Sequence, residues 1–163
     1  MAEKNVDDLI YVYNLCQEYY ALAEECLCDM TTFIPPILEY RAALEHVMRW
    51  IQNNEDVEKN KAMGHLKRAF FDIVDFICIN VRNDINNALR KVKKIKIEKC
   101  WDTYKEEKAK VYHMSEQLAK FRVHRMEGDT IQNSLKEPKE IVDEFLRIHK
   151  RFFTEVEPAL KKS

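Results

Sequence analysis

Glycine and proline are scarce in this chain of 163 residues, which contains two glycines and four prolines. Sheet proteins of this size need many more turn residues, because every strand must be joined to the next. The scarcity therefore excludes a strand-rich fold and predicts long helices joined by few turns. Gly64 and Gly128 stand alone in the sequence, so a glycine-rich loop that cradles a nucleotide phosphate is excluded as well.

Long apolar runs are also lacking. No run reaches the roughly 18 residues that a membrane helix needs, and the first residues, Met1 to Asn5, are polar and acidic. We therefore expect neither a membrane partner nor a signal peptide. The cysteines are an odd number, which without a signal peptide favours reduced thiols and a cytoplasmic location; they are Cys16, Cys26, Cys28, Cys78 and Cys100.

Patterns that bind metals are missing too. The chain has no Glu-x-x-His, which carboxylate-bridged di-iron bundles need twice, and no His-Glu-x-x-His of the zinc type. Cys26 and Cys28 have one residue between them and no second cysteine pair, so they make a poor half of a zinc site. We expect no metal and no cofactor.

What the chain does contain is typical of a packed helical protein, with 46% hydrophobic and 34% charged residues. Its charge is unevenly distributed: residues 1–60 carry a net charge of −8, residues 61–125 a net charge of +8, and residues 126–163 a net charge of −1. The basic middle would suit nucleic acid. It would equally suit the acidic first part of the same chain or of a second copy.

Apolar residues recur at helical spacing in five segments. We predict helices over about 6–30 and 35–52, with Pro35 and Pro36 in a first turn, then a third from about residue 56 to 80 or beyond. The third helix either bends near 80–87 or continues to Val92. Two further stripes, over 97–121 and 141–156, indicate an antiparallel hairpin. The expected fold is all-α: one domain over 1–163, an antiparallel bundle of about five helices with a core at 1–95 and a long C-terminal hairpin at 96–163, packed on the core or extending from it.

Two stretches resemble each other. Ala43-Leu44-Glu45-His46-Val47-Met48-Arg49 is echoed by Ala62-Met63-Gly64-His65-Leu66-Lys67-Arg68, so that two consecutive helices each carry a His and an Arg on one face. The short polar turn between the helices predicts that they pair antiparallel. We expect a shared polar cluster, in which His46 lies near His65 or Arg68 and Arg41 lies within reach of Asp72 or Asp75. The members of the cluster are Glu45, Arg49, His65, Arg68, Asp72 and Asp75, together with Arg41 and His46.

This cluster has two interpretations. In the first it is structural: Asp72 and Asp75 lie on an otherwise apolar helix, and Arg41, Arg49 or Arg68 neutralises them. Removal of the Asp72 carboxylate would then unfold the domain. In the second interpretation the cluster is a catalytic site, with Arg41 and His46 as candidate catalytic residues.

The catalytic interpretation depends on Arg41 and His46, which have four residues between them. This spacing resembles the motif of HEPN domains, all-helical modules of which many are metal-independent ribonucleases. The resemblance implies that two protomers or domains pair around a shared cleft. It also implies that His46 acts as general base or acid and that Arg41 holds the phosphate, roles that suit the two side chains. A catalytically silent relative would serve as a docking module.

A basic run provides a third lead. It carries Arg90, Lys91, Lys93, Lys94, Lys96 and Lys99, followed by Trp101 and Tyr104. Such a run can follow a phosphate backbone, or it can be a solvated helix end.

Three functions therefore stay open. The leading one is a non-enzymatic interaction or assembly module that forms a homodimer, a larger homo-oligomer or a complex with another protein. The alternatives are a HEPN-like ribonuclease of the toxin or defence type and a nucleic-acid-binding accessory subunit, with RNA as the partner.

Overall fold

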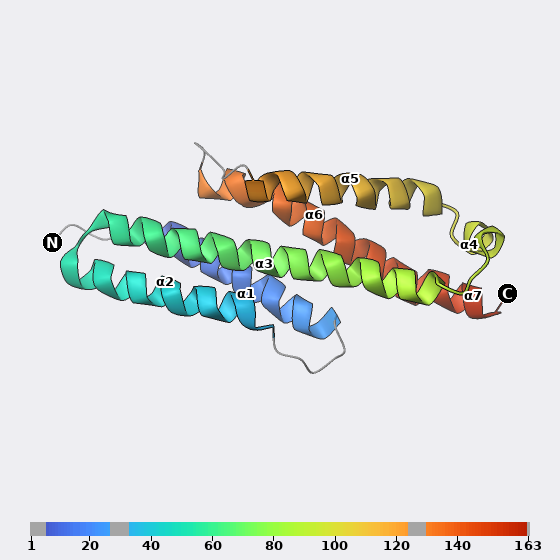
Figure 1. The fold of residues 1–163 in the computed structure, drawn as a ribbon, viewed down its shortest axis with the longest axis horizontal. Helices are drawn as coiled ribbons and strands as arrows, with labels where there is room; N and C mark the ends of the chain where they lie inside the picture. Colours follow the sequence, from blue (N-terminus) through green and yellow to red (C-terminus); the bar gives the residue numbers. More distant parts are fainter. Residues whose placement is uncertain (1–5, 27–32, 124–129, 163) are drawn as a thin grey trace. The chain divides into compact units, whose positions relative to one another are not determined.

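The computed structural model describes residues 6–26, 33–123 and 130–162. Within these ranges all regular structure is helical and no strand occurs (Figure 1), which confirms the all-α prediction. The helices are α1 (Asp7–Cys26), α2 (Ile34–Asn53), α3 (Asp56–Leu89), α4 (Lys94–Cys100), α5 (Tyr104–Val123), α6 (Ile131–Arg151) and α7 (Glu157–Lys162), with a π-helical turn, η1 (Phe152–Val156), between the last two. The sequence also predicts that helices break at Thr31-Thr32 and at Gly128-Asp129, and both positions lie outside the described residues.

The chain forms two compact units, Met1–Phe76 and Ile77–Ser163. The boundary between them lies inside α3, which is one unbroken helix of 34 residues. Of the two alternatives left open for residues 80–87, continuous helix is therefore the observed one, although α3 ends at Leu89 and not at Val92. The interpretation of residues 1–163 as a single domain with a core at 1–95 stays a prediction.

The first unit is built from α1, α2 and the first part of α3. Tyr19 of α1 packs edge-to-face on Phe70 of α3, with ring centroids 5.9 Å apart. Tyr13 of α1 meets Tyr40 of α2 in the same geometry at 6.1 Å. Because α1 contacts both other helices, the three enclose a common core, and one face of α1 is almost fully buried there.

A tight turn makes α2 and α3 antiparallel neighbours (Figure 1). Pro residues occupy the first turn of α2, as predicted, where their missing backbone donors cost little. At the other end Asn54 adopts a left-handed conformation (φ 57°, ψ 36°), and its N–H donates to the Trp50 carbonyl (2.9 Å). Asparagine tolerates this conformation better than most residues, so the chain reverses within two residues.

The second unit contains the end of α3 and all later helices. Four contacts show that α5 and α6 run antiparallel: Thr103–Arg151, Glu107–Arg147, Lys110–Glu144 and Gln117–Glu137 advance in opposite directions along the two helices. The predicted C-terminal hairpin is therefore present as α5–α6.

The hairpin begins later than expected, because the stripe over 97–121 is not one helix. It is interrupted at Trp101–Thr103, between α4 and α5. There the Thr103 N–H donates to the Asp102 side chain (2.8 Å), and such local bonds compete with the helical ladder.

The Asn54 turn generates a stability prediction. Asn54→Ala should lower the free energy of unfolding by about 1 kcal/mol, because alanine pays the full cost of the left-handed conformation. Asn54→Gly should leave it unchanged or slightly higher. Urea unfolding followed by circular dichroism measures both. Asn53→Ala, an exposed helical neighbour, is the control; a loss as large as that of Asn54→Ala would contradict the explanation.

Candidate functional site

The two histidines of the repeated motif meet between α2 and α3. The rings of His46 and His65 stack, with centroids 5.2 Å apart and an interplanar angle of 20°. Both side chains are largely buried, with 17% and 21% of their surface exposed. The expected approach of His46 to His65 is therefore present.

Each histidine is held by a glutamate from the opposite helix. His46 Nδ1 of α2 lies 2.6 Å from Glu58 Oε2 of α3, and His65 Nδ1 of α3 lies 2.7 Å from Glu39 Oε2 of α2. Lys61 donates to the other oxygen of Glu58 (2.6 Å), and Arg68 Nε donates to Glu39 Oε2 (3.0 Å). We call Glu39, His46, Glu58 and His65 the crossed Glu–His pairs.

The crossed Glu–His pairs extend the sequence repeat. In each helix the glutamate precedes the histidine of the same helix by seven residues. Each position of the α2 copy has its equivalent 19 positions later in α3. Two antiparallel copies of one pattern are related by a local two-fold relation, so each glutamate reaches the other copy's histidine. Glu39 and Glu58 were missed at the sequence level, although their common spacing to the histidines was the available signal.

The electrostatics of Glu58 are the most perturbed in this cluster. Hydrogen bonds from Lys61 and then from His46 lower the pKa of the Glu58 carboxyl to about 2. A buried carboxylate that accepts bonds from both sides is stable in its ionised form. Glu58 therefore fixes the start of α3 against the middle of α2.

Three candidate residues of α2 lie away from this cluster. Arg41, Glu45 and Arg49 are exposed, and Glu45 pairs with Arg49 one turn further along the helix. The described residues include no ion pair or hydrogen bond for the Arg41 side chain. The expected contact of Arg41 with Asp72 or Asp75 is therefore not among the contacts of the described residues.

Asp72 lies on α3 near Glu39 and Arg68. Partial burial and then the repulsion of Glu39 raise the pKa of the Asp72 carboxyl, while Arg68 opposes the shift. Of the three arginines expected to neutralise Asp72 or Asp75, Arg68 lies near Asp72 but donates its hydrogen bond to Glu39. The ionised Asp72 carboxylate is thus unfavourable in the fold, and the expectation that its removal unfolds the protein no longer follows. Asp75 is partly buried on the same helix.

The basic run of the sequence follows a change of chain direction. Arg90 and Lys91 lie in the turn after α3, Lys93 is the N-cap of α4, and Lys94, Lys96 and Lys99 belong to α4. Lys94 and Lys105 both approach Glu98, at 3.9 and 3.3 Å. The charges are spread around a turn and a helix of seven residues, and nucleic-acid binding through them stays a prediction.

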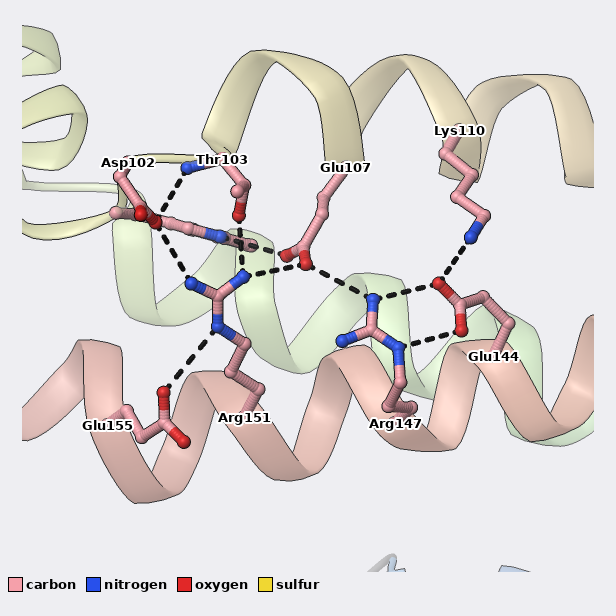
Figure 2. A network of polar contacts seen from close by, with 9 residues as sticks. Asp102, Thr103, Glu107, Lys110, Glu144, Arg147, Arg151 and Glu155 are labelled. Carbon is pink, nitrogen blue, oxygen red and sulfur yellow. Dashed lines mark hydrogen bonds and ion pairs between the residues drawn. The ribbon is translucent and has the colours of Figure 1, made fainter.

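A second polar network joins α5 and α6 in the other unit (Figure 2). At its centre is Glu107, whose side chain is 8% exposed. Glu107 Oε1 accepts from Arg151 (2.9 Å) and Arg147 (3.2 Å), and Oε2 accepts from the indole of Trp101 (2.9 Å). Arg147 also forms a two-bond pair with Glu144, which lowers the pKa of that carboxyl to about 2. Like Glu58, Glu107 fixes the register of a helix pair.

A groove of about 470 Å³ lies beside this network in the second unit. Side chains of α3 and α5 form its walls, including Val81, Ile85, Tyr104 and Val111, and Trp101 also lines it. Its volume is in the range of small-molecule sites. Sequence reasoning missed it, because it depends on how α3 and α5 diverge.

Among the residues with described positions, no three or more His, Cys, Asp or Glu side chains are arranged to hold a metal ion. Cys16, Cys78 and Cys100 take part in no disulfide bond among the described residues. None of the described helices combines the length and apolarity needed to cross a bilayer.

Comparisons with known proteins give no family or activity for this arrangement. No family model, no curated protein sequence and no solved structure matches the chain. The site must therefore be interpreted from its own geometry.

The low pKa of Glu58 predicts how stability depends on pH. Because the folded-state pKa lies near 2, below the ordinary value of 4.5, ionised Glu58 stabilises the fold above pH 4.5. This contribution is lost as the pH falls from about 4.5 to 2. Glu58→Gln should lower stability at pH 7 and reduce the loss across that range, measured by urea unfolding at several pH values. Glu55→Gln, the same change at an exposed position, should follow the wild type; equal curves for all three proteins would contradict the assignment.

The raised pKa of Asp72 predicts the opposite sign. Ionised Asp72 is unfavourable in the fold above its ordinary pKa of 3.8, so Asp72→Asn should stabilise the protein at pH 7 by about 0.5 kcal/mol or less, since solvent screens the site. The difference should vanish below pH 3.8, where the wild-type side chain is protonated in both states. Thermal unfolding at pH 7 and pH 3 tests this; a large loss on substitution would restore the structural role first expected for Asp72.

Proposed function

We propose that this protein is a helical interaction module that binds a protein partner through the outward face of α2. The observation that carries the proposal is a row of exposed side chains at alternating spacings of three and four residues, the heptad spacing of helices that pair. We call this row the α2 seam: Ile34, Ile37, Arg41, Leu44, Met48 and Ile51. Its five apolar members are between 42% and 61% exposed.

The orientation of α2 is unusual for a helix in a small protein. An amphipathic helix ordinarily turns its apolar face inward. In α2 the crossed Glu–His pairs occupy the inward face, together with Ala43 and Trp50, which are buried. The α2 seam lies on the opposite side, so the helix exposes aliphatic positions that the described part of its unit leaves largely uncovered.

The apolar surface continues from α2 onto α1. A groove of about 330 Å³ runs between the two helices and is lined by apolar side chains, including Ile10 and Tyr13 of α1, Val6 just before α1, and Leu44 and Val47 of α2. Val6, Ile10 and Tyr13 are themselves 36–51% exposed. Single exposed apolar residues are ordinary, but a contiguous patch of this size typically marks a binding surface.

The ribonuclease alternative requires the side chains of Arg41 and His46 to contact the same phosphate group. Five positions along a helix separate their directions by about 140°. Arg41 is exposed on the seam, whereas His46 faces α3 and is engaged by Glu58. This geometry favours an interaction role over a HEPN-like cleavage site within one chain. Chelator-resistant cleavage of single-stranded RNA that is lost in His46→Ala would support the enzyme instead.

Charges placed in the α2 seam should abolish partner binding. Leu44→Glu/Ile51→Glu puts two carboxylates where an interface needs apolar contact, and we expect affinity to fall about 100-fold or more, since each lost aliphatic contact is worth ~1.5 kcal/mol. The association is measured by sedimentation velocity of the purified protein and by mass of the complexes that copurify with the tagged chain from its own cells.

The matched control is Ile95→Glu/Tyr112→Glu, which introduces the same charges at two side chains of the second unit that are 79% and 69% exposed. It should behave as the wild type. Complexes that persist in the seam variant, or that disappear only in the control, would contradict the proposal.

A further inference from the structure

We infer that the partner of the α2 seam is a second copy of this chain, with the two α2 helices packed antiparallel across a two-fold axis. This inference rests on the proposed function and adds the identity of the partner and the register. Three features carry it: the spacing of the seam, its charges and its extent.

The spacing of the seam reads the same in both directions. Its successive steps are three, four, three, four and three residues, so a reversed copy can be laid on it with every layer matched. Ile34 then lies opposite Ile51 of the second copy, Ile37 opposite Met48, and Arg41 opposite Leu44. A self-complementary surface of this kind is what a two-fold interface requires.

The charges of α2 favour the antiparallel arrangement. Parallel helices would place Arg41 against Arg41 in one layer of the seam. In the antiparallel register Arg41 lies beside Glu45 of the second copy, and the contact occurs twice by symmetry. Within one chain, Arg41 has no charged partner among the described residues. Helix α2 carries two arginines and two glutamates, so the net charge of the helix does not oppose the pairing of two copies.

The extent of the surface suits a dimer. A helix of 20 residues is about 30 Å long, and the neighbouring α1 side chains widen the strip to roughly 20 Å, two helix spacings. The resulting area, on the order of 600 Å² per copy, is at the lower end of the roughly 600–1,000 Å² per partner of a stable interface. The seam and the neighbouring α1 side chains are therefore together large enough to hold two copies.

Charge reversal tests the register. Arg41→Glu and Glu45→Arg should each weaken the dimer at least tenfold, because each places like charges in contact twice. The two variants mixed together should recover dimers, since opposite charges then face each other. Lys120→Glu, the same charge change at an exposed position of the second unit, should leave the dimer intact. Sedimentation equilibrium gives the dissociation constants, and circular dichroism confirms helicity.

Two results would overturn the inference. A dimer that tolerates Glu45→Arg, or is strengthened when Arg41→Glu is mixed with the wild type, would be parallel. A wild-type chain that stays monomeric at the highest soluble concentration would exclude the second copy. If the wild-type chain is monomeric, the proposed function can still hold with a different protein partner. It fails as well if the Leu44→Glu/Ile51→Glu variant keeps every complex that the wild-type chain forms in its cells.

Discussion

The crossed Glu–His pairs are the interaction on which the first unit depends. Each of the two helices provides one glutamate and one histidine, and each glutamate holds the histidine of the opposite helix. The distances between the carboxylate oxygen and Nδ1 are 2.6 and 2.7 Å. A pair of this kind costs free energy when one member is removed, because the other is left buried without its partner. It therefore allows one register of α2 against α3, and any rotation of α2 about its axis would break both contacts together.

That constraint determines what α2 presents to its surroundings. With Glu39 and His46 directed at α3, the helix has its heptad positions on the outside, where the described residues leave them largely exposed. The second unit uses a related device. Glu58 and Glu107 are the buried carboxylates among the described residues, and each lies between two antiparallel helices. Buried ion pairs contribute little net stability, but they select one arrangement of their helices.

Sequence periodicity was sufficient for the helical class, the antiparallel α2–α3 pair and the α5–α6 hairpin, because each depends on local spacing. It also brought His46 and His65 together through the repeat. It did not identify Glu39 and Glu58, since a carboxylate in a helical pattern is ordinarily a solvated residue. The outward direction of the α2 seam was equally hidden. An apolar stripe predicts a buried face, and only the contacts with α3 reveal that this stripe lies on the other side.

Solvent access at Met48 tests the central claim that α2 is held with its apolar side outward. Met48 is 59% exposed and Met114 is 5% exposed, so peroxide should oxidise the two at different rates. In the Leu44→Glu/Ile51→Glu variant, which cannot pair through the seam, the account predicts fast oxidation of Met48 and slow oxidation of Met114, resolved by mass spectrometry of peptides. Oxidation of Met48 as slow as that of Met114 would show that the chain covers the seam itself and would contradict the account.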